Sequence, residues 1–344
     1  MSIREITERN EDLLLHERAV KSIDATRVRP EESCSVRSAF QRDRDRIIHS
    51  KAFRRLARKT QVFLNPDGDH YRNRLTHTLE VSQIARTICR ALKLNEDLCE
   101  AISLGHDLGH TPFGHSGEGI LAKLCSTGFH HAKQSLRVVD HLENEGKGLN
   151  LTDQVRDGIV RHSKGKGNIL SENRISLPAT LEGQIVRLAD IIAYVNHDLE
   201  DAIRAGVVAS DELDTNIADV LGHTHGQRIS RLVLSVISES DIDGGGDIRM
   251  SDEVHQALSA MRDFLYDHCY MKPALRTEFL KAQRLLEDLW EHFMKSEGLF
   301  PHGSEREIHV TDWLAGMTDR YAIRLWKDIN VPRSWYSDIS RDDL

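Results

Sequence analysis

Three histidines, one aspartate and one glutamate occur within fourteen residues of this chain, in the stretch GHDLGHTPFGHSGE at 105–118. Imidazole nitrogens and carboxylate oxygens bind divalent cations and transfer protons in catalysis. The same stretch contains four glycines and few side chains that could build a core. This composition indicates a metal or catalytic centre rather than a packing segment.

Two residues of this stretch, His106 and Asp107, are adjacent. In the middle of a helix, adjacent side chains point about 100° apart and seldom share a ligand. The sequence predicts a helix that begins after Asn95 and ends at this pair, where glycines turn the chain. At a helix end the two side chains can face one ion.

Two further candidate ligands lie on other predicted helices. His77 stands near the start of an amphipathic helix, and Asp190 lies in a strongly apolar one, where an unpaired carboxylate is costly to bury. Singly, each is better explained as a hydrogen-bonded histidine or an ion-paired aspartate. Together with the adjacent pair they predict one divalent ion, and two histidines with two carboxylates favour six-coordinate Mn²⁺, Mg²⁺ or Fe²⁺ over structural zinc. The predicted metal ligands are His77, His106, Asp107 and Asp190.

The elements that must position these residues are helices. The chain has seven prolines and 6% aromatic residues, and apolar residues recur at spacings of three and four through 75–92, 98–105 and 181–192. Asn95, Thr152 and Ser251 are predicted N-caps. The glycine-rich stretch 241–250 predicts a loop, or at most a short β-hairpin. We therefore expect an all-α fold.

Composition and charge narrow the function classes. With 344 residues, 39% of them hydrophobic and 29% charged, the chain can bury a full core, and it contains no apolar run of the roughly 20 residues that a membrane-spanning helix needs. We expect a cytoplasmic protein with no membrane association. Its five cysteines show no CxxC pairing and predict free thiols.

One basic run stands out from a net charge of −8: residues 41–60 hold eight Lys or Arg against two Asp. Two interpretations stay open. The run is either a solvated helix face with interleaved charges, or an anion site for phosphate or single-stranded nucleic acid.

The order H…HD…D resembles the HD-domain metal-dependent phosphohydrolases, and longer blocks resemble their deoxynucleoside triphosphate triphosphohydrolase branch, the dGTPase-like proteins. The resemblance covers most of the chain. His130 and Ala132 depart from it, because we expect Glu and Asn there. The matching blocks are RDRDRIIHSKAFRRLARKTQVF (43–64), NRLTHTLEV (73–81), GHDLGHTPFGHSGE, FHHAKQSLRVV (129–139), GLNLTDQVRDGIVRHS (148–163), ADIIAYVNHDLEDA (189–202) and AGMTDRYA (315–322).

The resemblance implies an HD-domain helical bundle that hydrolyses deoxynucleoside triphosphates (dNTPs) at the α-phosphorus to a deoxynucleoside and inorganic triphosphate. Phosphoryl transfer also needs a proton for the departing oxygen. His115 suits that role with Glu118 as its orienting partner, since a spacing of three places them on one helix face. His110 and His131 either contact phosphate or hydrogen-bond other site residues.

Three regions of the chain are expected. Residues 1–40 form an N-terminal helical segment, and residues 41–205 form the HD core. Residues 206–344 form a C-terminal helical extension that completes the site and the oligomer contacts.

Substrate contacts follow from the same comparison. An arginine at the position of Arg74 meets phosphate in the similar enzymes, and basic side chains nearby could join it. Tyr194 and Asp198 return to the helix face of Asp190, where the ring can pack on deoxyribose and the carboxylate can accept the 3′-hydroxyl proton. The remaining predicted substrate contacts are Arg54, Arg55, Gln61, Lys164 and Tyr321.

Several alternatives remain open. Another HD hydrolase, such as a nucleotidase, a phosphodiesterase or a (p)ppGpp hydrolase, would use the same metal ligands, and a nucleotide- or nucleic-acid-binding regulator would use the basic run. Many relatives are oligomers activated by a bound nucleotide, so the resemblance implies a homo-oligomer with an allosteric dNTP.

Overall fold

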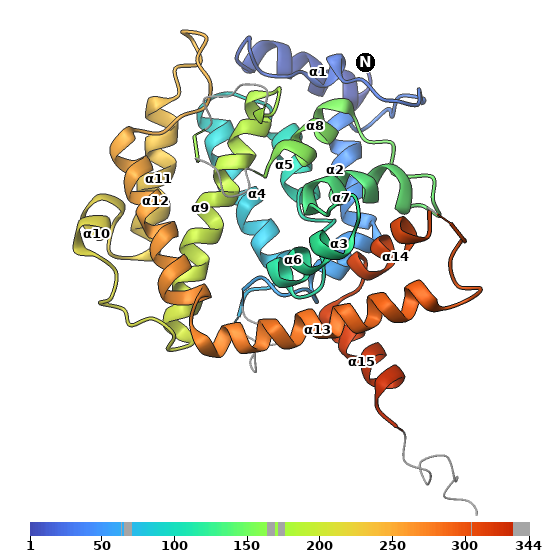
Figure 1. The fold of residues 1–344 in the computed structure, drawn as a ribbon. Helices are drawn as coiled ribbons and strands as arrows, with labels where there is room; N and C mark the ends of the chain where they lie inside the picture. Colours follow the sequence, from blue (N-terminus) through green and yellow to red (C-terminus); the bar gives the residue numbers. More distant parts are fainter. Residues whose placement is uncertain (63, 65–70, 164–168, 171–175, 304, 333–344) are drawn as a thin grey trace, which may run out of the picture.

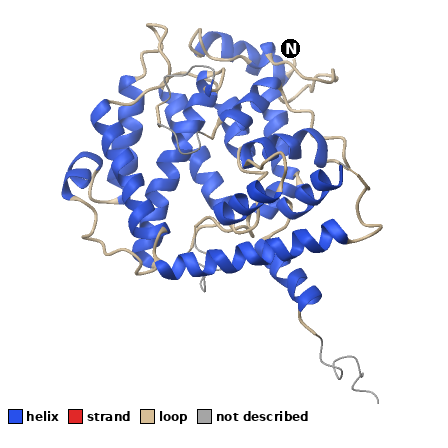
Figure 2. Cartoon of the chain, viewed as in Figure 1, coloured by secondary structure: helices blue, strands red, loops and turns tan. Residues whose placement is uncertain are grey.

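The computed structural model describes residues 1–62, 64, 71–163, 169–170, 176–303 and 305–332. Helices account for nearly all of its regular structure, and no β-strand occurs in those ranges (Figure 2). The predicted all-α fold is confirmed, and the glycine-rich stretch 241–250 is a loop. The α-helices of the described residues are α1 (Ile3–Leu14), α2 (Ala39–His49), α3 (Lys51–Leu56), α4 (Arg74–Ala91), α5 (Glu96–Gly105), α6 (Gly114–Leu124), α7 (His131–Arg137), α8 (Asp153–Arg161), α9 (Leu181–Arg204), α10 (Thr215–Leu221), α11 (His225–Glu239), α12 (Asp252–Leu265), α13 (Pro273–Lys295), α14 (Glu305–Ala315) and α15 (Asp319–Asn330).

Side-chain caps fix where the helices begin. The Asn95 side chain accepts the backbone N–H groups of the first turn of α5, and Thr152 and Ser251 cap α8 and α12 in the same way. These three predicted N-caps are confirmed. Thr180 caps α9, the long helix that carries Asp190. Asn95 thus fixes the start of α5, and the ten residues of this helix lead to the histidine–aspartate pair.

The main apolar core lies between α4, α5 and α9, which run side by side through the middle of the molecule (Figure 1). Ile84, Ile102 and Ile185 are representative, with at most 1% of each exposed. Helices α2 and α8 pack against α5, and α11 and α12 pack against α9. Three central helices therefore hold all four predicted metal ligands near one another.

A second apolar cluster joins α6 to the end of the chain. Long α13 crosses the base of the molecule beneath α6, and α14 and α15 pack on it (Figure 1). Leu121 of α6 and Leu286 of α13 are fully buried there. Packing thus does not follow chain order, since α6 joins α13–α15 in the second cluster, whereas α10–α12 belong to the main core. The division of the chain at residues 40 and 205 stays a proposal.

Among the residues that the structure describes, no helix combines the length and apolar character that crossing a lipid bilayer requires.

Candidate metal centre and its histidine cluster

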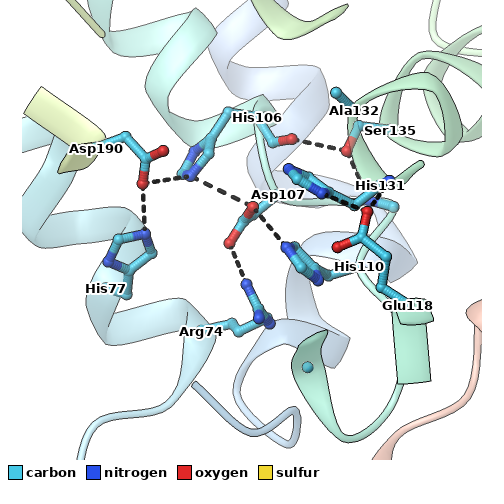
Figure 3. Close-up of polar contacts among 12 residues, drawn as sticks. Arg74, His77, His106, Asp107, His110, Glu118, His131, Ala132, Ser135 and Asp190 are labelled. Atoms are coloured by element: carbon cyan, nitrogen blue, oxygen red, sulfur yellow. Dashed lines mark hydrogen bonds and ion pairs between the residues drawn. The ribbon is translucent and has the colours of Figure 1, made fainter. Parts of the chain in front are cut away.

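The histidine–aspartate pair lies directly after the last turn of α5. His106 is the C-cap of this helix, and both members of the pair are buried. The turn that follows packs against the backbone of α7, because a Cβ added at Gly109 would lie 2.1 Å from the Ser135 nitrogen. The Ser135 hydroxyl accepts the Gly109 N–H at 2.9 Å and donates to the His106 carbonyl at 2.7 Å (Figure 3). Only glycine permits this approach, which fixes the direction of the pair.

The four predicted metal ligands converge from α4, α5 and α9 (Figure 3). His77 Nε2 lies 3.1 Å from Asp190 Oδ1. His106 Nε2 lies 3.9 Å from the same oxygen and 3.5 Å from Asp107 Oδ1. Donor atoms of His77, His106 and Asp107 all lie within 4.8 Å of one another, and Asp190 joins them through its contacts with the two histidines.

The protonation of His106 suits a cation. Its Nδ1 lies 2.6 Å from the Ser103 carbonyl oxygen, a contact that only an N–H can make. In the tautomer with hydrogen on Nδ1 alone, Nε2 offers a lone pair, and this buried atom has no hydrogen-bond partner. Such a nitrogen, facing two carboxylates, is a costly arrangement without a cation. The residues present thus fit a divalent metal ion.

Arg74 adds a fixed positive charge beside this centre. It is 2% exposed, and its Nη1 donates to Asp107 Oδ2 at 2.7 Å. Burial alone would raise the pKa of Asp107, but His106, His110 and Arg74 outweigh that effect and hold the pKa well below its usual range. For Asp190, burial is likewise outweighed by His77 and His106, which lower its pKa. Both carboxylates are ionised at neutral pH, as metal ligands must be.

A row of further histidines extends from the centre. The rings of His110 and His131 are stacked with centroids 4.2 Å apart. Glu118 Oε1 accepts from the backbone N–H and the Nδ1 of His131, at 2.8 and 2.9 Å. Its other oxygen lies 3.4 Å from Nδ1 of His115, whose side chain is 82% exposed. The predicted His115–Glu118 neighbourhood is thus present, but Glu118 holds His131 more tightly than it holds His115.

His162 completes the row, and nothing in its local sequence distinguishes it beyond its place in a matching block. It is 2% exposed and follows α8 directly. Its ring lies 4.9 Å from that of His106, and its Nε2 lies 3.1 Å from Nε2 of His131. Burial, with His106 and His131 close by, lowers the pKa of His162 to about 3, so this ring is neutral.

The expected sugar contacts share one face of α9. Asp198 is buried, and burial raises its pKa to about 7. The Tyr270 hydroxyl donates to Asp198 Oδ2, while Oδ1 has no partner. Tyr194 is half-buried on the same helix. Tyr270 was missed, because a tyrosine 72 residues further along the chain carries no local sign of this contact.

Several predicted substrate residues lie elsewhere. Arg54 is exposed and donates to the His49 carbonyl of the preceding helix. Arg55 and Tyr321 line a pocket of about 600 Å³ between α3 and the C-terminal helices, whose lining includes Gly109 but none of the four candidate ligands. Gln61 is half-buried beside the start of α6. Lys164 lies outside the described residues.

The block AGMTDRYA has a positioning role that sequence did not reveal. Asp319 is buried, and its carboxylate accepts the backbone N–H of Thr60 at 2.9 Å and that of Phe113 at 3.0 Å. Phe113 adopts a left-handed backbone conformation with φ of 62° immediately before α6. The C-terminal region thereby holds the turn from which His115 and Glu118 project.

Comparisons with known proteins agree with this geometry. The HD domain matches residues 74–195, and the phosphohydrolase-associated domain matches residues 248–328. A protein of Caldanaerobacter subterraneus subsp. tengcongensis is 51% identical over 346 residues, which cover 98% of each chain. A protein of Desulfatibacillum aliphaticivorans is 48% identical, over 96% of this chain and 99% of its own. Both are named deoxyguanosinetriphosphate triphosphohydrolase-like proteins.

Among solved structures, a hypothetical protein from Aquifex aeolicus is 21% identical, with a TM-score of 0.47 over 82% of this chain and 67% of that one. The assignment to a family rests on the sequence relatives, because the matched region covers nearly the full length of this chain and of each relative. This chain belongs to the deoxyguanosinetriphosphate triphosphohydrolase-like family of HD-domain proteins.

Proposed function

We propose that this chain hydrolyses deoxynucleoside triphosphates at the α-phosphorus and releases a deoxynucleoside and intact inorganic triphosphate. The observation that carries the proposal is the cluster of two histidines and two ionised carboxylates in mutual contact, with the buried guanidinium of Arg74 directly beside them. With a divalent ion bound there, the ion and Arg74 would together present positive charge to a substrate whose reacting part is a chain of phosphates. The relatives' printed name agrees with this substrate class.

The proposed metal ligands are His77, His106, Asp107 and Asp190. A divalent ion held there would neutralise charge on the phosphate oxygens and favour ionisation of an attacking water. The donor set, imidazole with carboxylate, suits Mn²⁺, Fe²⁺ or Mg²⁺.

Arg74 and His110 supply phosphate contacts from the protein itself. Asp107 holds Nη1 of Arg74, while the buried Nε of the same guanidinium has no partner. His110 is 2% exposed and has a buried Nδ1 without a partner. A phosphate oxygen that accepts from Nε of Arg74, or from His110 in the tautomer with hydrogen on Nδ1, would satisfy an otherwise unpaired buried group.

We assign the general acid to His115. Its exposed ring leaves it free to meet the 5′-oxygen of an incoming nucleotide, and Glu118 lies close enough to orient the imidazole through Nδ1. Burial alone would raise the pKa of Glu118, but its hydrogen bonds to His115 and His131 lower it well below the usual range. Burial alone would lower the pKa of His131, but the ionised Glu118 outweighs that effect and raises it.

Deoxyribose selectivity is assigned to Tyr194 and Asp198, with Tyr270 as an added member. The unpartnered Oδ1 of Asp198 can accept the 3′-hydroxyl proton, and Tyr270 holds the other oxygen in place. An aromatic ring packed against the sugar excludes a 2′-hydroxyl by contact.

The remaining proposed partners are single-stranded nucleic acid, an allosteric dNTP and further copies of this chain. The first part of the basic run forms ion pairs, including Arg46 with Glu31 at 2.6 Å and Arg44 with Glu100 at 3.3 Å. These arginines therefore have structural partners, which weakens the case for single-stranded nucleic acid. A homo-oligomer, an allosteric dNTP and a cytoplasmic location follow from the family resemblance.

The proposal is tested by incubating the full chain with each dNTP, each ribonucleotide, (p)ppGpp and a cyclic dinucleotide, in Mn²⁺ and in Mg²⁺. Chromatography then identifies the products. We expect deoxynucleoside and triphosphate from at least one dNTP and far slower turnover of the matching ribonucleotide. Release of pyrophosphate from (p)ppGpp, or hydrolysis of the cyclic dinucleotide alone, would assign another HD activity.

A further inference from the structure

The pocket of about 600 Å³ beside α3 adjoins the turn that follows the histidine–aspartate pair. Leu108 and Gly109 of this turn line the pocket, and none of the four candidate metal ligands does. Its other walls come from α3, α7, the turn of helix at 138–142, and α14 with the chain that follows it (Figure 1). A volume of this size is typical of pockets that hold small molecules.

One wall of the pocket is aromatic. Phe300, Trp313 and Tyr321 all line it, and the rings of Phe300 and Trp313 meet edge to face with centroids 6.5 Å apart. Trp313 is 47% exposed, although indole is one of the largest apolar side chains. A flat ring placed against Trp313 would remove apolar surface from water and stack on the indole. This wall therefore suits a planar aromatic ligand.

A buried lysine also lines the pocket. Lys59 is 3% exposed, and its amine donates to the carbonyl oxygens of His110 and Ala315, the latter at 2.8 Å. Burial lowers the pKa of Lys59 to about 7, and an anion in the pocket would favour the charged form. The charged amine has three hydrogens, of which the two carbonyls use two. Lys59 can thus donate to an anionic ligand and keep both contacts.

Arg55 provides a second cationic group. Its side chain is 42% exposed and lies 3.6 Å from Glu143, which is too far for a hydrogen bond. Among the described residues of the lining, Arg55 and Lys59 are the only arginine and lysine. The carboxylate of the lining, Asp312, is already paired with Arg137 at 2.7 Å. The pocket therefore suits one anionic group rather than the larger charge of a triphosphate.

The same lysine connects the pocket to the metal centre. Lys59 holds the carbonyl of His110, and Nε2 of that histidine lies 3.5 Å from Asp107 Oδ1. Gly109, which lines the pocket, donates its N–H to Ser135 of α7 at 2.9 Å. A ligand held by Lys59 would therefore restrain the turn at 108–110 from the side opposite its contact with α7.

We propose that this pocket is an effector site for a small ligand with a flat aromatic ring and one anionic group. The ring packs against Trp313 and Tyr321, and the anionic group accepts from Lys59 and Arg55. Binding restrains the turn at 108–110. Nucleoside monophosphates and aromatic carboxylates share this chemistry. The site is separate from the metal centre, and its ligand differs in charge from a dNTP.

Isothermal titration of the full-length protein tests the site, with dGMP and indole-3-acetate as probes and no dNTP present. We expect at least one of the two to bind with one ligand per chain, and the one that binds identifies the anion as phosphate or carboxylate. The uncharged partners, deoxyguanosine and 3-methylindole, should bind about tenfold more weakly or less, because they offer no acceptor charge to the two cations. Equal binding of an uncharged partner, or no binding of either anion at millimolar concentration, would overturn the proposal.

Variants of the lining locate the bound ligand. Trp313→Leu removes the stacking ring and Arg55→Gln removes a charged donor, so each should weaken binding by about tenfold. Both side chains are substantially exposed, and circular dichroism should show that both variants fold. Arg58→Gln removes the same charge from an exposed residue outside the lining and should bind as the wild type does. Full affinity in Trp313→Leu and Arg55→Gln, with loss in Arg74→Gln, would place the ligand at the metal centre and overturn the proposal.

Amide hydrogen exchange tests the effector role. The bound ligand should slow exchange in peptides that cover residues 107–111 and leave exchange in α1 unchanged. Binding without slower exchange at 107–111 would overturn this role. Because no dNTP enters these experiments, a chain that binds the ligand but hydrolyses no dNTP would refute the proposed function and leave the effector site standing.

Discussion

At the scale of single residues, Glu118 is the centre of the proposed proton-transfer arrangement. It accepts from His131 at 2.9 Å and lies 3.4 Å from His115, so one carboxylate serves an exposed ring and a buried one. The exposed ring is free to reach the leaving oxygen, whereas the buried ring is already engaged with His162. This difference supports His115 as the proton donor.

His115→Ala should therefore keep its metal and still bind dNTP, while kcat falls by about 10²- to 10⁴-fold, the usual effect of losing a general acid. Glu118→Gln should also lower kcat, because His115 loses the carboxylate that orients its imidazole. Metal analysis, nucleotide titration and steady-state rates check these outcomes. A folded, metal-loaded His115→Ala protein with a near-normal rate contradicts the assignment.

At the scale of elements, the start of α6 depends on close packing between Gly117 and the carbonyl oxygen of Pro112. A Cβ at Gly117 would lie 2.1 Å from the Pro112 carbonyl oxygen, whereas one at Gly119 would meet nothing within 4 Å. Gly117→Ala must therefore shift the helix start that carries His115 and Glu118. Gly119→Ala only removes the flexibility of a helical glycine.

Gly117→Ala should lower the free energy of unfolding by about 1–3 kcal/mol, as overpacking does, and should reduce kcat. Gly119→Ala should leave unfolding unchanged or raise its free energy by about 0.5–1 kcal/mol. Urea unfolding and rates of the two variants provide the comparison. Equal stability of the pair would show that the start of α6 adjusts freely.

Another element-scale feature is the buried carboxyl of Glu182 at the start of α9. Its Oε1 accepts the backbone N–H groups of Val20 and Asn95, at 3.0 and 3.1 Å, and so ties the N-terminal segment to α5 and α9. Burial raises the pKa of Glu182 from 4.5 to about 7. Between these pH values the folded state keeps a proton that the unfolded chain has released, so stability falls as pH rises.

Glu182→Gln keeps the accepting oxygen and removes this titration. Its stability should equal that of the wild type near pH 4.5 and exceed it by about 3 kcal/mol above pH 7. Denaturant unfolding of both proteins at pH 5 and pH 8 measures the difference. A difference that stays constant across this range would show that Glu182 is ionised throughout.

The helices also show how much of the fold and of the candidate site could be predicted from the sequence. Helix starts at Asn95, Thr152 and Ser251 were predictable because a cap depends on residues a few positions apart. The four candidate ligands could be nominated because each lies in a distinctive local motif. His162 and Asp319 could not, because their partners lie 31 and 206 residues away and meet them only through packing. Contacts of that range carry no local pattern.

At the scale of the whole molecule, the C-terminal helices support the centre without lining it. Asp319 of α15 accepts from the loop after α3 and from the turn before α6, and the second apolar cluster buries α6 against α13. The two clusters therefore meet at the start of α6. Loosening the C-terminal region should disturb His115 and Glu118 before it disturbs the metal ligands.

Asp319→Ala leaves two buried backbone N–H groups without an acceptor, each costing about 1–3 kcal/mol. The melting temperature should fall and amide exchange in α6 should rise, while exchange in α5 changes little. Arg320→Ala, which alters the exposed neighbour of Asp319, is the matched control. Uniform acceleration of exchange in both helices would mean that the two clusters unfold as one unit.

The attack of water on the α-phosphorus is the central claim, and oxygen-18-labelled water tests it most directly. The protein is incubated with dGTP and Mn²⁺ in labelled water, and mass spectrometry locates the label in the products. Attack at the α-phosphorus with departure of the 5′-oxygen puts the label in inorganic triphosphate and leaves the deoxynucleoside unlabelled. Label in a nucleoside monophosphate, in pyrophosphate or in orthophosphate would contradict the account, because water would then have attacked to break a different bond.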